Sequence, residues 1–280
     1  MHEYVIIDCT FMHMYRHVRT NAQAVMIPIA LSPDERQARI LDLLAGADRL
    51  PVAGLAERFG TSEDSIRRDL RALAGAGRIR RVHGAILPAA VLGGFDQRVG
   101  EDAPDKAAIG RAAAALVADA ASLLVDGGTT TRAVVAALPR DRRIQVVTTS
   151  LPVVDALADH PLAEVVVVGG RFDRHSRTTV GAEAVAAIRG FRADVCLLGL
   201  CAVDTAAGIT AVGYEEAAVK RAMIEAAARV VAVTTADKIG TVSPNVVGPA
   251  AAIDVLVTDR APAAADAEAL AALGVAVVVA

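Results

Sequence analysis

Apolar residues between positions 33 and 60 recur at helical spacing and predict two helices. The first covers 33–45, with Ser32 as its N-terminal cap and Pro33 at its first position, where the missing N–H of proline is tolerated. The second is expected from about 52 to 59, because Gly60 is a residue type that commonly ends a helix. The folded part of the chain is therefore predicted to begin with helices.

A third predicted helix begins after Thr61 or Ser62 and presents two chemically different faces. Its apolar face contains residues at i, i+4 and i+7, namely Ile66, Leu70 and Leu73. At about 100° per residue, the opposite face carries Asp64, Arg67, Arg68 and Arg71. Two helices joined by a tight turn, the second of them cationic, are typical of a DNA-recognition unit. An ordinary solvated helix has the same pattern, so this face alone does not decide between them.

The segment after this helix favours the DNA-binding interpretation. Residues 78–84 read Arg-Ile-Arg-Arg-Val-His-Gly, a short alternating run with a turn that predicts a basic wing. Between residues 62 and 85, six arginines stand against three acidic residues, whereas the whole chain has a formal net charge of −3. The overall charge excludes a protein that is basic throughout, and the local excess predicts a basic patch confined to this segment.

Beyond residue 104, short apolar runs alternate with helical stretches, a pattern that predicts an α/β domain with a parallel sheet and Rossmann-like layers. The predicted strands are 122–125, 144–148, 165–168, 195–198, 230–233, 255–257 and 275–279. The predicted helices are 106–118, 131–138, 151–158, 181–188, 215–228 and 263–273. Glycines and prolines interrupt any period over 88–104, which is the expected linker between a head at 32–87 and a domain at 105–280.

The loop after the first predicted strand has the composition of an anion site. Residues 126–131 read Asp-Gly-Gly-Thr-Thr-Thr and lead directly into a helix. Two glycines let backbone N–H groups converge, three hydroxyls add donors, and a helix N-terminus favours negative charge. The loop therefore predicts a phosphate cradle, although a glycine-rich turn with threonine caps looks the same. Asp126 suits a sugar hydroxyl better than a phosphate.

Other predicted strand ends carry weaker signals. Residues 148–150 read Thr-Thr-Ser and 169–171 read Gly-Gly-Arg, while Asp204 is a free carboxylate in the loop after 195–198. Lys220 and Lys238, two of only three lysines in the chain, lie in or beside such loops. Ligands of open α/β sheets bind at the carboxyl ends of strands, so these groups are candidates for one pocket. Each of the two loops alone favours ordinary turn chemistry, and each lysine alone is equally compatible with an ordinary surface position.

Several classes of protein find no support in the sequence. No GxGxxG motif follows the first predicted strand, and three widely spaced cysteines predict neither a disulfide framework nor a zinc site. We expect no cofactor. No apolar run approaches the roughly 20 residues that span a bilayer, and a cytoplasmic protein without a membrane partner is expected. Residues 1–31 are expected to be an irregular extension, either a poorly ordered arm or a segment preceding a true start at Met26.

The run TSEDSIRRDLRALAGAGRIRRVHGA at 61–85 resembles the helix-turn-helix and wing of the DeoR family of bacterial transcriptional regulators. It departs from the usual family pattern at Ser65, where threonine is common, and at Ala85, where a second glycine is common. The DNA contacts that the resemblance implies are Ser62, Ser65, Arg67, Arg68 and Arg71 on the helix and Arg80, Arg81 and His83 on the wing. Asp69 would repel phosphate, so we expect it to pair with a neighbouring arginine and orient it.

Residues 98–259 resemble the effector domain of the same family, whose fold is related to ribose-5-phosphate isomerase. The resemblance rests on DGGTTT at 126–131, TTS at 148–150, GGR at 169–171, the run from 208 beginning GITAVGYEE, and TADK at 235–238. It implies a site for a phosphorylated sugar formed by Asp126, Gly127, Gly128, Thr129, Thr130, Thr131, Ser150, Arg171, Asp204, Glu215, Lys220 and Lys238. The sequence departs at Thr149, where asparagine is usual, and at Ala236, where serine is usual.

Two functions remain open from the sequence. The first is a transcriptional regulator, most often a repressor in this family, that binds double-stranded operator DNA as a dimer or tetramer and responds to a phosphorylated sugar. The second is a sugar-phosphate isomerase-like enzyme with an appended DNA-binding head. Isomerisation requires a carboxylate base and an electrophile, for which Asp204 and Lys220 are the candidates. Related isomerases have a cluster of aspartates where this chain has one, which favours the regulator.

Overall fold

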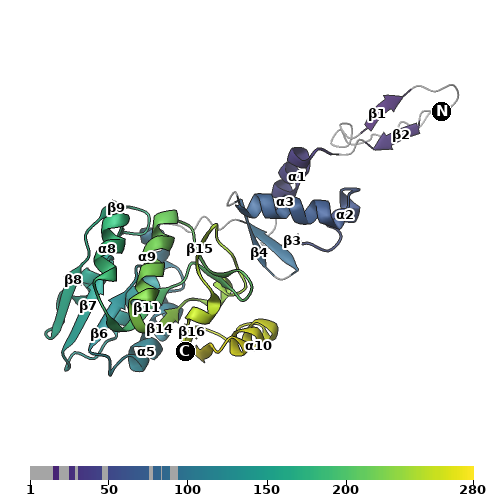
Figure 1. Cartoon of the computed structure of the whole chain (residues 1–280). Helices are drawn as coiled ribbons and strands as arrows, with labels where there is room; N and C mark the ends of the chain where they lie inside the picture. Colours follow the sequence, from purple (N-terminus) through teal and green to yellow (C-terminus); the bar gives the residue numbers. More distant parts are fainter. Residues whose placement is uncertain are drawn as a thin grey trace.

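The computed structural model describes residues 15–18, 25–28, 31–45, 50–75, 78–82, 84–88 and 94–280 (Figure 1). Most of the expected N-terminal extension lies outside these residues. Within it, β1 (Tyr15–Val18) and β2 (Val25–Pro28) pair as an antiparallel ladder, which the irregular charge pattern of this segment did not predict. None of the helices in the described ranges is long and apolar enough to cross a membrane.

The described part of the head contains three helices and a small antiparallel sheet. The helices are α1 (Pro33–Ala45), α2 (Leu55–Arg58) and α3 (Glu63–Gly75). The strands are β3 (Leu50–Pro51), β4 (Ile79–Val82) and β5 (Ala85–Pro88), in the order β3-β5-β4. α1 has the predicted bounds, and its capping box is formed by Ser32 and Glu35. α2 is shorter than predicted because Gly54 has a φ of 84°, a left-handed conformation that a helix does not continue through.

Among the described residues of the head, eight buried apolar residues form a core. Ile66, Leu70 and Leu73 of α3 pack against α1, α2 and the sheet, and each is at most 4% exposed. The remaining members are Ile40, Leu44, Leu55, Ile79 and Ile86. The apolar face predicted for the third helix is therefore the face that it buries.

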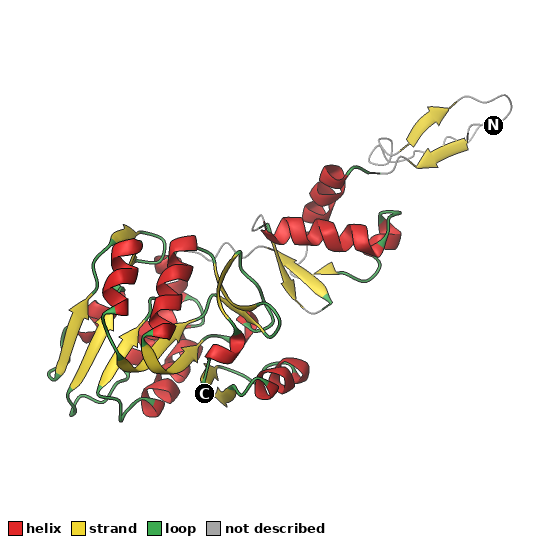
Figure 2. Ribbon diagram, in the orientation of Figure 1, coloured by secondary structure: helices red, strands yellow, loops and turns green. Residues whose placement is uncertain are grey.

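The described residues from 94 onward contain a seven-stranded parallel sheet covered by helices on both faces (Figure 2). Its order is β17-β16-β14-β11-β6-β7-β8. The strands are β6 (Ser122–Val125), β7 (Ile144–Thr148), β8 (Ala163–Val167), β11 (Ala193–Gly199), β14 (Ala227–Val233), β16 (Val255–Thr258) and β17 (Ala276–Val279). All seven strands are predicted by their apolar runs, and the predicted α/β fold class is confirmed.

Alternating residues along the strands face two separate cores. Leu123 and Val125 of β6 belong to the core with α5 (Ala103–Leu116), α6 (Thr129–Ala136) and α7 (Leu151–Leu157). Leu124 belongs to the core with α8 (Ala182–Arg189) and α9 (Tyr214–Glu225). Leu270 of α10 (Ala264–Ala272) packs in this second core as well. A strand that is buried on both faces has apolar residues at nearly every position. These strands could therefore be predicted from continuous apolar runs in the sequence.

The sequence analysis did not predict the short strands that lie outside the seven-stranded sheet. β9 (Arg171–Asp173) and β10 (Thr178–Val180) form a hairpin. β12 (Ala202–Asp204), β13 (Gly208–Ala211) and β15 (Asn245–Gly248) form a three-stranded sheet, and the turns η2 (Ala236–Lys238) and η3 (Ala250–Ala252) lie beside it in the chain. These strands have three or four residues each, too few to show a period.

The expected linker at 88–104 is wrong in one respect, because it contains a helix. α4 (Phe95–Gly100) lies within it, and α5 begins at Ala103. Phe95 is only 4% exposed, so burial of an aromatic ring stabilises a helix that the glycines on either side conceal in the sequence. Gln97 accepts the N–H of Gly94 at 3.0 Å, which caps the start of α4.

Candidate nucleic-acid interface and ligand pocket

The outer face of α3 is built as predicted. Arg67, Arg68 and Arg71 are all exposed, while Ile66 and Leu70 on the other face are buried. Ser62 caps the helix: its Oγ accepts the N–H of Ser65 at 3.2 Å and lies 3.0 Å from the Ser65 hydroxyl. The two serines therefore hold each other at the N-terminal end of α3, the end that a recognition helix directs at base edges.

Arg67 is held by two acidic residues of its own helix. Its guanidinium lies 3.2 Å from a Glu63 carboxylate oxygen and 3.8 Å from one of Asp64. These pairs are exposed, with 60% of the Arg67 side chain accessible, and such pairs contribute about 0 to 1 kcal/mol. Arg67 can therefore exchange them for a phosphate or a guanine edge at little cost.

Asp69 does pair with an arginine, but the partner is not on the recognition face. Its Oδ2 accepts from Nε of Arg36 on α1 at 2.5 Å, and its Oδ1 accepts from Gln37 at 3.2 Å. Asp69 is 3% exposed and Arg36 is 8% exposed. This buried ion pair holds α1 against α3. Asp69 therefore stabilises the packing of these two helices and does not orient a DNA-contacting side chain.

The predicted wing is the antiparallel pair of β4 and β5. Gly84 turns the hairpin with a φ of 68°. Ala85, where the resemblance departs from glycine, begins β5 as a buried strand residue, so the methyl group is accommodated there. The His83 contact lies outside the described residues, as do the side chains of Arg80 and Arg81, and these three contacts stay predictions.

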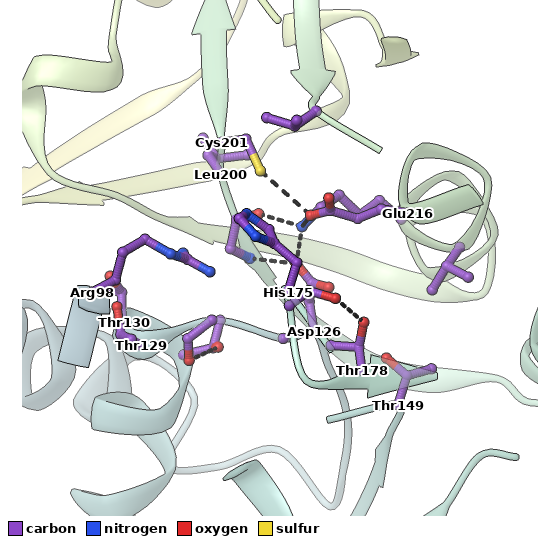
Figure 3. Close-up of a pocket in the computed structure, with 18 of the residues that line it drawn as sticks. Arg98, Asp126, Thr129, Thr130, Thr149, His175, Thr178, Leu200, Cys201 and Glu216 are labelled. Atoms are coloured by element: carbon purple, nitrogen blue, oxygen red, sulfur yellow. Dashed lines mark hydrogen bonds and ion pairs between the residues drawn. The ribbon is translucent and has the colours of Figure 1, made fainter. Parts of the chain in front are cut away.

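The candidate ligand pocket lies at the point where the strand order reverses. β6 is the first strand of the sheet in the chain, and its neighbours β7 and β11 lie on opposite sides of it. The loops after β6 and β11 therefore diverge at their carboxyl ends and leave a crevice, the position where open α/β sheets bind ligands. The residues that line it are Arg98, Asp126, Gly127, Gly128, Thr129, Thr130, Thr131, Thr149, His175, Ser176, Thr178, Val180, Gly199, Leu200, Cys201, Val212, Glu216, Val219, Lys220, Val233 and Lys238 (Figure 3).

The predicted cradle forms one wall of this pocket. α6 begins at Thr129, so the first-turn N–H groups that no helical carbonyl can accept are directed toward the loop at 126–128. Gly128 has a φ of 145°, and a Cβ on Gly127 would lie 2.2 Å from Cγ2 of Thr178. Both glycines are therefore required, one for its backbone conformation and the other for its close contact with β10.

A buried ion network closes the floor of the pocket. The ammonium of Lys220 donates to Asp126 and, at 2.8 Å, to the carbonyl oxygen of Gly199, and it lies 3.4 Å from a Glu216 carboxylate oxygen. The Gly199 N–H donates to Asp126 at 3.1 Å. Asp126 and Lys220 do line the pocket as predicted, but each is already occupied by the other, so the expected bond from Asp126 to a sugar hydroxyl has a competitor in place.

The protonation of this network follows from burial and charge. Burial raises the pKa of the Asp126 carboxyl, although the Lys220 ammonium opposes that shift. Burial by itself lowers the pKa of Lys220, but the Asp126 and Glu216 carboxylates outweigh it and the net shift is upward. Burial, with the nearby Glu216 carboxylate, raises the pKa of the Cys201 thiol to about 12. Lys220 is therefore cationic, and Cys201 is a neutral thiol that donates to Glu216 at 3.4 Å.

Four predicted pocket residues do not line the pocket in the part of the chain that the structure describes. Arg171 and Glu215 form an ion pair with each other, in which the Arg171 side chain is exposed and the Glu215 side chain is partly exposed. Asp204 ends β12, where its Oδ1 accepts the N–H groups of Ala206 and Ala207 at 2.9 and 2.7 Å. Ser150 is buried, and its Cβ lies 3.8 Å from the position of a Cβ on Gly127. The structure therefore does not bring these four to the pocket: Asp204 accepts hydrogen bonds within its own turn, and Arg171 and Glu215 pair with each other. A contact of any of the four with an effector stays a prediction.

The structure adds pocket residues that the sequence did not single out. Thr149 lines the pocket although Ser150 of the same motif was chosen, and Glu216 lines it although Glu215 was chosen. Glu216 is four residues from Lys220 on one helix face, and that spacing was the signal for it. His175 comes from the β9–β10 hairpin, which was not predicted. Arg98 comes from α4, inside the expected linker.

Cationic groups gather on the side of the pocket nearest α4. Arg98 and Lys238 both line it, and Lys106 lies behind them, 5% exposed. Burial first, and the nearby charge of Lys238 second, lower the pKa of Lys106. Its Nζ donates to the carbonyl oxygens of Arg98 and Glu101, at 2.8 and 2.5 Å. An anion bound beside Arg98 and Lys238 would therefore relieve repulsion between like charges.

Thr149 offers a buried hydroxyl to a polar ligand in the pocket. Its side chain is fully buried, and its Oγ1 has no hydrogen-bond partner among the described residues. A buried hydroxyl without a partner costs about 1 to 3 kcal/mol, whereas a hydrogen bond to a ligand would satisfy it. The hydroxyl is therefore available to an oxygen or nitrogen of a molecule bound in the pocket.

Replacing Thr149 by valine should separate ligand binding from stability. We expect the free protein to be as stable as the wild type or more stable, because an unsatisfied hydroxyl is removed, while the dissociation constant for a bound ligand rises by about two- to tenfold. Calorimetry and thermal unfolding measure the two effects. Thr234→Val is the matched control, since Thr234 Oγ1 is also buried without a partner among the described residues but does not line the pocket. Equal ligand affinity in both variants would contradict the assignment.

Both the head and the α/β domain match known protein families. Residues 36–88 match the family model described as a DeoR-like helix-turn-helix domain, and residues 101–260 match the DeoR C-terminal sensor domain. The two matches leave residues 89–100 between them, the stretch that contains α4.

Curated relatives match over most of their length. The HTH-type transcriptional regulator GlpR of Haloferax volcanii is 33% identical over 88% of this chain and 97% of its own. The HTH-type transcriptional repressor GlcR of Bacillus subtilis is 31% identical over 82% of this chain and 89% of its own. The glycerol-3-phosphate regulon repressor of Escherichia coli is 29% identical over 81% and 91%.

Solved structures align less closely. The full-length sorbitol operon regulator SorC of Klebsiella pneumoniae is 13% identical with a TM-score of 0.38, over 83% of this chain and 98% of its own. Ribose 5-phosphate isomerase A of Methanocaldococcus jannaschii is 13% identical with a TM-score of 0.36, over 50% of this chain and 55% of its own.

Proposed function

This chain belongs to the DeoR family of transcriptional regulators, and we propose that it is a repressor of a carbohydrate-metabolism operon whose DNA binding is controlled by a phosphorylated sugar. The head would bind double-stranded operator DNA through α3 and the wing. Two or more heads, in a dimer or tetramer, would read half-sites about one helical turn, or 34 Å, apart. The Escherichia coli relative that is named for the glycerol-3-phosphate regulon supports a phosphorylated effector.

The observation that carries the proposal is the combination of groups in the pocket at the strand-order reversal. The first turn of α6, which follows Gly127 and Gly128, provides backbone N–H donors. Arg98 and Lys238 provide positive charge, and Thr149 provides a hydroxyl that has no partner among the described residues. Donors and cations on one side suit a phosphate, and a hydroxyl on another side suits the sugar that carries it. The whole set is matched by a molecule with one anionic end and one polyhydroxyl end.

An isomerase with an appended head is supported less well. Aldose–ketose isomerisation needs a carboxylate base within hydrogen-bond reach of the substrate carbon that loses its proton. Among the described residues, Asp204 does not line the pocket, and Asp126 is engaged by Lys220 and Gly199. Lys220 is engaged in turn, so neither group nominated from the sequence is available for that chemistry. We therefore propose a sensor without catalytic activity.

Thermal unfolding in the presence of small molecules tests the proposal. We expect glucose 6-phosphate, fructose 1-phosphate or glycerol 3-phosphate to raise the melting temperature, and glucose, fructose and glycerol to leave it unchanged. A ligand at one hundred times its dissociation constant stabilises the folded state by about 2.7 kcal/mol, which is readily detected. The ligand that stabilises the protein should also change its affinity for operator DNA. Stabilisation by the unphosphorylated sugars alone, or by none of the six compounds, would contradict a phosphorylated effector.

A further inference from the structure

Helix α4 occupies a position between the two functional parts of the chain. The wing strand β5 ends at Pro88, and α4 begins at Phe95. The six intervening residues span at most about 25 Å even at full extension. A displacement of α4 beyond the length of this short connection must therefore also move the head. Helix α4 also packs against α6, the helix that begins at the cradle.

One residue of α4 reaches the ligand pocket itself. Arg98 is half-buried and lines the pocket wall. Figure 3 shows its side chain extending into the pocket from the side on which Thr129 and Thr130 lie. A guanidinium in this position and the first turn of α6 can contact the same anion, because charge-assisted bonds from arginine to phosphate are among the strongest that proteins form. The bound anion would thus join α4 to α6.

Helix α4 also contacts the β9–β10 hairpin. The Phe95 N–H donates to the carbonyl oxygen of His175 at 2.8 Å, and Asp96 forms an ion pair with Arg177 at 2.8 Å. The guanidinium of Arg177 also lies 5.9 Å from the centroid of the Phe95 ring, within cation–π range. The start of α4 is therefore fastened to the hairpin at three points.

The same hairpin forms part of the pocket. His175, Ser176 and Thr178 all line it, and the hydroxyls of Ser176 and Thr178 lie 2.7 Å apart. Asp173 orders the hairpin turn by accepting the N–H groups of His175 and Ser176 at 2.8 and 3.3 Å. A ligand that contacts this wall meets His175, whose carbonyl oxygen binds α4, and the two residues on either side of Arg177, which pairs with α4.

Resting on the proposed function, we propose that α4 with the β9–β10 hairpin is the element that couples the pocket to the DNA-binding head, and that Arg98 is the residue through which it senses the phosphate of the effector. A ligand can shift a conformational equilibrium only by binding one state better than the other. Contacts to Arg98 and to the hairpin provide that difference, because they depend on where α4 lies. Contacts to the α6 cradle alone do not.

Two substitutions in the full-length protein test this coupling. The DNA is the duplex that the wild-type protein selects from random sequence, and the ligands are glucose 6-phosphate, fructose 1-phosphate and glycerol 3-phosphate. Arg98→Ala should weaken binding of the active ligand about tenfold or more, since it loses a charge-assisted contact. Arg177→Ala should keep ligand affinity and ligand-free operator affinity within threefold of the wild type. In Arg177→Ala, the change in operator affinity caused by the ligand, typically 5- to 150-fold, should fall below twofold.

Arg174→Ala is the matched control for Arg177→Ala. It removes the same charge from the same exposed hairpin, and among the described residues no ion pair joins Arg174 to α4. We expect it to behave as the wild type. The side chain of Arg177 is 45% exposed, so its replacement leaves the fold intact. Circular dichroism and unfolding curves of each variant verify this.

The outcomes distinguish this inference from the proposed function. A wild-type protein that binds none of the ligands overturns both. A wild-type protein whose operator affinity responds to a ligand, with an equal response in Arg177→Ala, overturns the coupling role alone. Loss of ligand affinity in Arg177→Ala also overturns it, since the hairpin would then be part of the binding site only. Unchanged ligand affinity in Arg98→Ala overturns the sensing role of Arg98.

Discussion

Replacing Arg67 and Arg68 together by alanine should abolish specific operator binding and leave the fold intact. Both side chains are exposed on the outer face of α3, and their removal uncovers no apolar core. Bidentate arginine contacts to guanine discriminate by about 1 to 3 kcal/mol each, so two of them correspond to a loss of roughly thirtyfold to twenty-thousandfold. If one of these arginines contacts a phosphate instead, its removal should reduce the slope of the salt dependence of binding by about one unit.

Gel shift and fluorescence anisotropy at physiological salt measure the effect. Arg143→Ala with Arg192→Ala is the matched control: it removes the same charge from two exposed arginines of the α/β domain and should leave operator affinity unchanged. Nanomolar affinity retained by the α3 double variant at physiological salt would count against α3 as the recognition helix. Loss of affinity in both double variants would indicate a general electrostatic effect instead.

The head was largely predictable because its signals are local. A serine cap, a glycine stop and apolar residues at i, i+4 and i+7 are all read within a few residues of each other. The role of Asp69 was not predictable in the same way. Its partner Arg36 is 33 positions away, and only the packing of α1 on α3 brings the two together. A charged residue between two arginines on a helix is naturally assigned to them when the fold is unknown.

The position of the pocket was predictable for a different reason. Parallel strands place all their carboxyl ends at one edge, so loops distant in sequence meet there, and the cradle at 126–131 was found from that rule. This rule does not determine which side chains of these loops point into the pocket. Glu215 and Glu216 differ by one helical step of 100°, which turns Glu216 toward Lys220 and Glu215 toward Arg171. Arg98 was missed because glycines on both sides of α4 suggested a linker.

Replacing Lys220 by methionine should destabilise the α/β domain strongly. The side chain is 2% exposed and is the common partner of Asp126 and Glu216, so methionine leaves the Asp126 carboxylate buried without its cation. Removing one partner of a buried ion pair typically costs about 3 to 5 kcal/mol. For a domain of this size, roughly 2 to 4 °C of melting temperature is lost per kcal/mol, which predicts a decrease of about 6 to 20 °C.

The variants needed to interpret this loss are Asp126→Asn, Asp126→Asn with Lys220→Met, and Arg171→Ala. If the cost arises from a stranded charge, the double variant should be more stable than Lys220→Met alone, because asparagine is neutral and still accepts the Gly199 N–H. Arg171→Ala breaks the exposed pair with Glu215 and should cost no more than about 1 kcal/mol. A melting temperature of Lys220→Met within 2 °C of the wild type would show that water, or protonation of the Asp126 carboxyl, compensates for the lost ammonium. In that case Lys220 would be free to contact the effector after all.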